Sequence, residues 1–238
     1  MTKPLAGRRV LVTGGVRRIG RAIALECAEF GADIIFTSRK LDQEADALVE
    51  LLRSLGVRAF AVTCDVRVPD SVTAAVAEAA GLLGGIDVLV NNAGAFESAA
   101  LESLDVAQWD AMFETNTRGP LLVAQAAYPH LKAAGGRIIH IGSLGGVKPW
   151  ATHGHYCASK AALHMLSATM AKAWAPEISV NCVAPGMIVF DDEPGLAAKT
   201  PMGRNGTAAD VVAAVVFFAT APTFVTGQLL VVDGGLGL

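Results

Sequence analysis

The sequence is poor in charge, and the charges that it has nearly cancel. Only 17% of its 238 residues are charged, whereas 53% are hydrophobic, and the formal net charge at pH 7 is −3. This balance gives no electrostatic reason to bind nucleic acid or an anionic membrane surface, so we expect neither as a partner. The apolar content instead favours a large core or a buried oligomer interface.

The sequence also has few cysteines and no long apolar run. No stretch approaches the ~20 residues of a membrane-spanning helix, and residues 1–7 lead directly into a short strand pattern rather than a signal peptide. Cys27, Cys64, Cys157 and Cys182 show neither close pairing nor a metal-like spacing with histidine. We therefore expect no metal site, reduced thiols in the core and a cytoplasmic protein.

Short apolar runs alternate with helical patterns along the chain. The runs predict strands at residues 9–13, 34–37, 59–63, 88–90, 137–141, 179–183 and 229–232, and the helical patterns between them include 19–29, 45–55 and 71–83. Near-continuous apolar strands separated by helices predict a parallel sheet covered on both faces. The expected fold class is α/β: a single domain over residues 1–238 with a Rossmann-type, doubly wound parallel sheet. Its ligand crevice is expected at the carboxyl ends of the strands.

The least regular segment is residues 190–207, which contain acidic, proline and glycine residues. We expect this segment to be a lid over the crevice and to bear on the substrate. An ordinary surface loop is the alternative.

Three residues suited to proton transfer follow one another near the middle of the chain. Ser143 closes the predicted strand at 137–141, Tyr156 follows it by thirteen residues, and Lys160 comes four residues later in a helical pattern. Residues four apart share a helix face, so the phenol and the ammonium point the same way. A hydroxyl, a phenol and a cation around one reacting oxygen suit proton transfer to or from a carbonyl or alcohol.

The tyrosine–lysine spacing by itself proves little. Tyr128 is also followed four residues later by a lysine, Lys132. Pro129 follows this tyrosine and no strand-ending serine precedes it. This second pair therefore indicates an amphipathic helix with a solvated lysine.

A glycine turn joins the first predicted strand to the helix after it. Gly14 and Gly20 frame this turn, and Arg17, Arg18 and Ile19 lie between them. Glycines let the backbone approach a pyrophosphate, and the amides of the following helix face it. The segment is therefore predicted to bind a dinucleotide, with two arginines beside the phosphates.

The end of the second predicted strand indicates which dinucleotide binds. It runs into Ser38, Arg39 and Lys40. A site that prefers NAD usually has an acid there, whereas an arginine suits the 2′-phosphate, with which it forms two parallel hydrogen bonds. We therefore predict NADP(H) as the cofactor. The alternative is that these are solvated charges beyond a strand.

Further motifs complete a resemblance to the short-chain dehydrogenase/reductase family that extends over nearly the whole chain. They are Cys64-Asp65-Val66 after the third strand, Asn91-Asn92-Ala93-Gly94 after the fourth, Pro185-Gly186 after the sixth, Thr226-Gly227, and Val232-Asp233-Gly234-Gly235. The resemblance implies an NADP(H)-dependent enzyme that reduces a ketone, with a 3-oxoacyl thioester as one candidate. It also implies a homo-oligomer, a tetramer in this family.

The resemblance also assigns roles to individual residues. The catalytic residues that it implies are Asn116, Ser143, Tyr156 and Lys160. The cofactor-binding residues are Gly14, Arg17, Arg18, Ile19, Gly20, Ser38, Arg39, Cys64, Asp65, Val66, Asn91, Ala93, Gly94, Tyr156, Lys160, Pro185, Gly186 and Ile188.

In the expected mechanism Tyr156 is the general acid and Ser143 donates a hydrogen bond to the substrate oxygen. A free tyrosine has a pKa of ~10, and a pKa of ~7 is optimal for proton transfer at neutral pH. Lys160 is therefore expected to lower the Tyr156 pKa by ~3 units, which corresponds to roughly 4 kcal/mol of preference for the phenolate. By resemblance, Asn116 would hold a water that relays protons from Lys160. A buried amide that braces a helix is the other interpretation of Asn116, and both remain open.

The chain departs from the family pattern in three places. Arg18 stands where a glycine is usual, and the basic pair before Ile19 resembles the pteridine reductase branch. Those enzymes, however, typically have aspartate where Ser143 stands. Phe190 lies near a position where a hydroxyl residue commonly assists nicotinamide binding. Two alternatives follow: a pteridine reductase-like enzyme that reduces a dihydropterin, and a non-catalytic dinucleotide sensor.

The substrate end is the least determined part of the site. Its expected contacts, besides the 190–207 segment, are Phe96, Leu144, Trp150, His153 and His155. Phe96 and Phe190 could stack on a flat ring. An excess of apolar residues on the helical patterns at 120–134 and 158–174 supports the oligomer prediction; they are Leu121, Leu122, Leu163, Met165, Leu166 and Met170.

Overall fold

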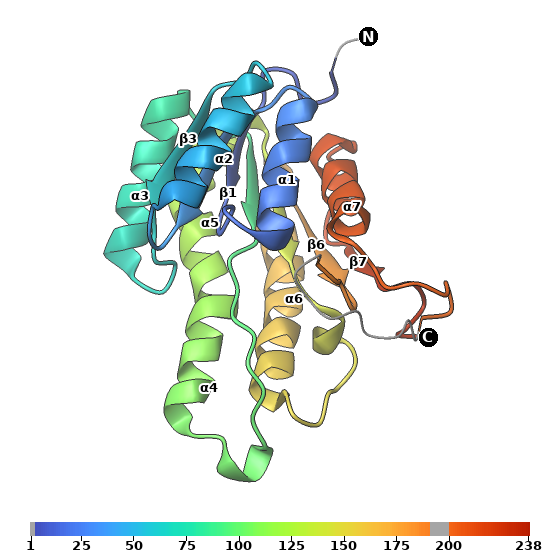
Figure 1. The fold of residues 1–238 in the computed structure, drawn as a ribbon. Coiled ribbons are helices and arrows are strands. Elements are labelled where there is room, and N and C mark those ends of the chain that lie inside the picture. The colour runs from blue at the N-terminus through green and yellow to red at the C-terminus, as the bar shows by residue number, and fades with distance from the viewer. Residues whose placement is uncertain (1–2, 191–199) are drawn as a thin grey trace.

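A seven-stranded parallel sheet forms the centre of the molecule (Figure 1). The computed structural model describes residues 3–190 and 200–238. The strand order is β3-β2-β1-β4-β5-β6-β7. The strands are β1 (Arg9–Val12), β2 (Asp33–Ser38), β3 (Ala59–Thr63), β4 (Val88–Asn91), β5 (Arg137–Ile141), β6 (Ser179–Pro185) and β7 (Leu229–Val232).

Helices cover both faces of this sheet. The long helices are α1 (Arg18–Glu29), α2 (Gln43–Ser54), α3 (Pro69–Leu83), α4 (Val106–Phe113), α5 (Gly119–Ala134), α6 (Gly154–Trp174) and α7 (Ala208–Thr220). The short ones are η1 (Leu101–Ser103), the π-helical turn η2 (Glu114–Arg118) and η3 (Leu144–Gly146). One face packs against α1, α2 and α7, and the other against α3, α5 and α6 (Figure 1).

Alternation along the strands creates two cores. In β1, Val10 and Val12 face the α1, α2 and α7 side, whereas Leu11 faces the α3 and α5 side. All three are at most 1% exposed. Fully burying an aliphatic side chain of this kind contributes about 1.5–3 kcal/mol. Apolar side chains on both faces explain why the strand sequences are continuous apolar runs.

The chain reverses direction across the sheet between β1 and β4. From β1 it builds outward through β2 to β3, and then crosses back to β4 on the other side of β1. Such a switch point leaves a crevice at the carboxyl ends of the central strands. The loops after β1, β4 and β5 meet there.

The predicted fold class is confirmed, and the element boundaries shift by only a few residues. β2 begins at Asp33, and β6 extends to Pro185. The centre of the predicted lid, residues 191–199, lies outside the described residues, so the lid stays a prediction. None of the described helices is long and apolar enough to cross a membrane.

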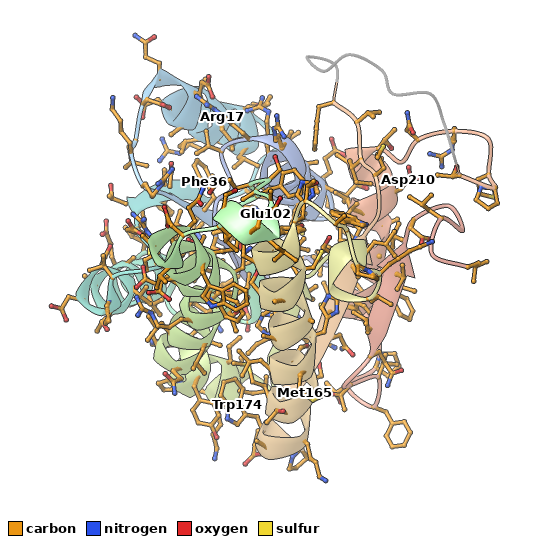
Figure 2. The ribbon with its side chains drawn as sticks, turned by 90° about the horizontal axis from the view of Figure 1, so that it is seen from below. Arg17, Phe36, Glu102, Met165, Trp174 and Asp210 are labelled. Atoms are coloured by element: carbon orange, nitrogen blue, oxygen red, sulfur yellow. The ribbon has the colours of Figure 1, made fainter. Side chains whose placement is uncertain are left out.

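The predicted apolar excess on the surface of α5 and α6 is wrong for two of its six members. Leu163 and Met170 are buried, because α6 turns these side chains into the sheet core. Met165 is 69% exposed, and Trp174 at the end of the same helix packs on Tyr128 of α5 with ring centroids 5.1 Å apart (Figure 2). A helix that covers a broad sheet needs a wide apolar face.

Candidate active site

A cavity of about 1130 Å³ occupies the crevice at the carboxyl ends of the strands. Six of the strands, β1 to β6, are followed by residues that line it. The predicted site residues on its wall are Gly14, Arg17, Arg18, Ile19, Gly20, Ser38, Arg39, Cys64, Asp65, Val66, Ala93, Gly94, Ser143, Tyr156, Lys160, Pro185, Gly186 and Ile188. Asn91 and Asn116 stand behind this wall.

The glycine turn is held against the loop that follows β4. Gly14 has φ +64°, a backbone conformation that favours glycine, and a Cβ at Gly20 would collide with the carbonyl oxygen of Gly14. The Asn92 side chain donates to the carbonyls of Thr13 and Gly14, at 3.0 Å each, and the Thr13 hydroxyl accepts from the Asn92 and Ala93 amides. The result is a tight backbone cradle at the N-terminus of α1, which suits a pyrophosphate.

The backbone conformation at Arg18 explains why glycine is usual at this position. Its φ is +52°, in the left-handed region where a side chain costs roughly 1–2 kcal/mol. The guanidinium carbon lies 5.0 Å from the ring centroid of Phe190. The chain thus keeps a cation beside the glycine turn in a conformation that favours glycine.

The other arginines at this end of the cavity differ in how far their charge is compensated. Arg17 forms an exposed ion pair with Glu44 of α2. Arg67 pairs with Asp65 at 2.6 Å, and this hydrogen-bonded guanidinium lowers the Asp65 pKa to about 2. Arg39, at the end of β2, lines the cavity, whereas Lys40 does not. Arg39 is therefore the cation placed to meet a group bound beyond β2.

Ser143, Tyr156 and Lys160 come together on one wall of the cavity. Ser143 lies just beyond β5, where its hydroxyl caps η3 by accepting from the Gly145 amide at 3.0 Å. Tyr156 and Lys160 lie one turn apart near the start of α6. The Lys160 ammonium is 6.0 Å from the Tyr156 ring centroid and donates to the carbonyl of Ile141 at 2.8 Å. A strand end and a helix start thus position all three groups.

The ionisation of these groups differs in part from our expectation. Burial raises the Tyr156 pKa, and a hydrogen bond with Ser143 opposes that rise. The net shift of the Tyr156 pKa is therefore opposite to the expected lowering, because desolvation of the phenolate is the larger effect. Burial also lowers the Lys160 pKa to about 8, so this side chain is still mainly charged at neutral pH.

Asn116 lies in the π-helical turn and is fully buried. Its side-chain oxygen accepts from the Ala95 amide at 2.7 Å, and its nitrogen donates to the Ala95 carbonyl and to Ser159. These bonds tie η2 both to the loop after β4 and to α6. The structure therefore favours the bracing interpretation of this amide.

Two residues of the site, Asn92 and His164, were not predicted from the sequence. Asn91 was predicted to bind cofactor, but its side chain points inward to the Pro120 carbonyl and His140; the adjacent Asn92 lines the cavity instead. His164 accepts a hydrogen bond from the Ser143 amide through Nε2 at 3.3 Å. No sequence motif marks His164, although its position one turn after Lys160 places it on the same face of α6.

Aromatic rings form the cavity wall beside Tyr156. Phe96 stacks on His153 at 4.7 Å and meets Tyr156 edge to face at 4.8 Å. Trp150 lies parallel to Tyr156 at 6.0 Å. Phe96 and Phe190 both line the cavity, but they pack against different partners, His153 and Arg18. Leu144 and His155 are buried, and neither lines the cavity.

Comparison with known proteins adds independent information. A family model described as enoyl-(acyl carrier protein) reductase matches residues 14–237. The 3-oxoacyl-[acyl-carrier-protein] reductase of Staphylococcus aureus is 34% identical, over 96% of this chain and 98% of its own. A short-chain dehydrogenase from Burkholderia cenocepacia, solved in complex with NADP, is 39% identical over 98% of both chains, with a TM-score of 0.91. An NADH-dependent reductase of alginate metabolism reaches the same TM-score at 34% identity, again over 98% of both chains.

Proposed function

The chain belongs to the short-chain dehydrogenase/reductase family, and from this premise we propose that it reduces a ketone to an alcohol with NADPH. The observation that carries the proposal is that Ser143, Tyr156 and Lys160 share one cavity with the glycine turn. A nicotinamide dinucleotide and a carbonyl substrate would therefore meet beside the phenol. The balanced reaction is ketone, NADPH and a proton giving alcohol and NADP⁺.

The cofactor-facing residues suit a dinucleotide by their chemistry and their shape. The cradle at Gly14 and Gly20 would receive the pyrophosphate at the amides of α1. Arg39 would pair with a 2′-phosphate. Asp65 and Val66, beyond β3, would contact the adenine, and Pro185 and Gly186, beyond β6, would contact the nicotinamide. When bound, the reduced cofactor supplies the hydride.

The reacting oxygen would lie between two hydroxyl groups. Ser143 would donate a hydrogen bond to the oxygen as negative charge develops on it. Tyr156 would give its proton to that oxygen. The positive charge of Lys160 favours the phenolate that remains and opposes the effect of burial. Because burial brings the Lys160 pKa to about 8, this assistance would fade in alkaline solution.

We propose that Asn116 holds the site together. Its bonds to Ala95 and Ser159 keep the loop after β4 and helix α6 at a fixed separation. The Asn116 oxygen and the Lys160 nitrogen both lie beside Gly94: a Cβ added there would be 3.3 Å from the oxygen and 3.6 Å from the nitrogen. This closeness of Asn116 to the buried ammonium supports a second interpretation, a role in a proton relay from Lys160.

The two alternative functions receive less support. A non-catalytic sensor has no use for a serine, a tyrosine and a lysine grouped in the cavity. For a dihydropterin, the favourable features are the cation of Arg18 and the exposed ring of Phe96. Ser143 argues against the pterin, because a neutral donor suits a developing alkoxide better than a carboxylate does.

A panel assay of NADPH oxidation tests the proposal directly. The panel should contain a β-ketoacyl thioester, a small diketone and dihydrobiopterin, each with NADPH and with NADH. We expect the ketones to be reduced faster than the pterin, and NADPH to be preferred. A pterin preference that survives Ser143→Asp and disappears in Arg18→Gly would reverse the assignment.

We further propose a homo-oligomer. The β7 edge of the sheet supports this proposal, because Leu229 and Leu230 are about two-fifths exposed there and Phe217 of α7 is half exposed. Unpaired strand edges with apolar side chains favour association. Light scattering should give a mass above 24.5 kDa, consistent with a tetramer. A monomer at micromolar concentration would refute this.

Two further proposals concern location and the lid. The four cysteines are all free, and three of them are buried, which fits a reducing compartment such as the cytoplasm. Residues 190–207 follow the nicotinamide-facing end of β6, and this position supports a role as a substrate lid.

A further inference from the structure

The cavity is divided by charge. Its described arginines follow β1, β2 and β3, at the cofactor end: Arg17, Arg18, Arg39 and Arg67. Lys160 lies between the two ends, with its ammonium bound to a backbone carbonyl. Among the described residues that line the substrate end, from Phe96 to Thr115 and from Trp150 to His153, the one charged side chain is Glu97.

The wall outside the substrate end carries the same sign. Residues 97–114 contain five Asp or Glu and no Lys or Arg. The Glu97 carboxylate accepts a hydrogen bond from Gln108 of α4, and no ion pair compensates it within the described chain. A negatively charged substrate would therefore enter against like charge, and the described lining of this end offers no cation to replace its water.

The neutral part of the substrate end is aromatic. Phe96 is 63% exposed, although it stacks on His153 and forms edge-to-face pairs with Trp150 and Tyr156. Because most of the Phe96 side chain is still exposed and it lines the cavity, part of its ring is accessible to a bound substrate. Ring faces pack best on other rings, in offset or edge-to-face arrangements. The Trp150–Tyr156 spacing of 6.0 Å is too small to admit a ring between them, so these rings form a wall for one side of a substrate.

We propose that the substrate is a ketone that carries a flat ring and no anionic group. This inference rests on the proposed reductase function and narrows it. The ring would pack against the exposed part of Phe96, with the carbonyl directed at Tyr156 and Ser143. A free carboxylate or a phosphate-bearing carrier thioester is disfavoured, because both bring negative charge to the mouth at Glu97.

Four matched ketones test the two parts of the proposal separately. Methyl 4-acetylbenzoate has a ring and no charge, and 4-acetylbenzoate has the same ring with a carboxylate. Methyl 5-oxohexanoate and 5-oxohexanoate repeat the comparison without a ring. We expect kcat/KM to be highest for methyl 4-acetylbenzoate, and each ester to exceed its acid by about tenfold or more.

Two substitutions assign these preferences to residues. Glu97→Gln should reduce the ester-to-acid ratio to within about threefold for both pairs, because the like charge is removed. Phe96→Leu keeps an apolar side chain but loses the ring face, and it should lower the ring-to-chain ratio by about threefold or more while the ester-to-acid ratio is kept. Glu78→Gln, on the outer face of α3, is the matched control for charge and should change neither ratio.

Butane-2,3-dione separates failure of this inference from failure of the proposed function. If the dione is reduced and the acids match their esters, the inference is wrong and the reductase stands. If neither NADPH nor NADH supports reduction of any ketone, the proposed function is wrong. Calorimetric titration of the four compounds into the protein with NADP⁺ then decides the inference alone: tighter binding of the ring ester supports it, and equal binding of the acid overturns it.

Discussion

The two ends of the cavity are built in different ways. The cofactor end depends on backbone geometry: a glycine turn, the amides of α1 and strand ends that follow one another in the sheet. The substrate end depends on side chains from segments that are far apart in sequence, such as Phe96 after β4 and Trp150 before α6. The first arrangement is fixed by the fold, whereas the second can change residue by residue. We therefore expect substitutions at the two ends to have separable effects.

The largest expected effect falls where the two ends meet. Tyr156→Phe removes the proton donor but little ground-state binding. Turnover should fall by about 10²-fold to 10⁴-fold, and the cofactor dissociation constant, measured by calorimetry, should hardly change. Tyr128→Phe is the matched control, because Tyr128 also precedes a lysine by four residues but packs on Trp174 away from the cavity. Turnover near the wild-type rate in Tyr156→Phe would remove the phenol from the mechanism.

Arg39→Ala should affect the cofactor end alone. Loss of charge-assisted hydrogen bonds to a 2′-phosphate should weaken NADPH binding by roughly 1.5–3 kcal/mol, while NADH binding and the ranking of ketones should be unchanged. Calorimetry with both cofactors measures the difference. The neighbouring Lys40→Ala is the control, since Lys40 does not line the cavity. Equal affinity of the wild type for both cofactors would show that Arg39 does not recognise the phosphate.

His164 accepts a hydrogen bond from Ser143, where the two ends of the cavity meet. Its contribution to the free energy of unfolding should depend on pH. Burial lowers its pKa to about 4, so the folded protein favours the neutral ring and the unfolded chain binds the proton first. The free energy of unfolding should therefore fall as pH drops from about 6.5 toward about 4, by up to about 2 kcal/mol between pH 7 and 5. Denaturant unfolding at several pH values measures this slope.

His164→Gln and His164→Leu separate titration from support. Glutamine can still accept the Ser143 amide but cannot titrate, so its variant should lose His164's part of the pH slope and keep its turnover. Leucine removes the acceptor and should lower kcat more than it raises KM. His140, whose pKa burial lowers to about 3, leaves a residual slope in both. An unaltered slope in His164→Gln would contradict the assignment of a partly buried, neutral imidazole.

The smallest expected effect compares two helix caps. Asp105 caps α4 in a reciprocal capping box with Gln108, and Asp42 caps α2 by accepting from the Glu44 and Ala45 amides. Replacing either by alanine should cost about 1 kcal/mol of folding free energy. Only Asp105→Ala should also raise the KM for a ketone, because α4 walls the substrate end. A similar KM change in Asp42→Ala would show that the two ends are coupled.

The cofactor end could be predicted from the sequence more completely than the substrate end. The apolar strands, the glycine turn and the pairing of Tyr156 with Lys160 depend on local periodicity, and the comparisons confirm the family and the carbonyl reductase class that these motifs indicated. Phe96, Trp150 and His153 were expected at the substrate end and do line the cavity. The packing of these rings on Tyr156 and the hydrogen bond between Ser143 and His164 join distant segments, and no local pattern predicts such contacts. Leu163 and Met170 were wrongly placed on the surface, because the sequence of one helix does not show how wide a sheet the helix covers.

The place of Trp150 gives the protein an optical reporter of its own substrate end. The chain has three tryptophans; Trp109 stacks on Phe113 of α4, Trp174 packs on Tyr128, and Trp150 alone lines the cavity. In a variant with phenylalanine at positions 109 and 174, all indole emission would come from the ring that lies parallel to Tyr156. Reduced nicotinamide absorbs where indole emits, so quenching of this single fluorophore would show, in real time, cofactor and ketone arriving at the same wall.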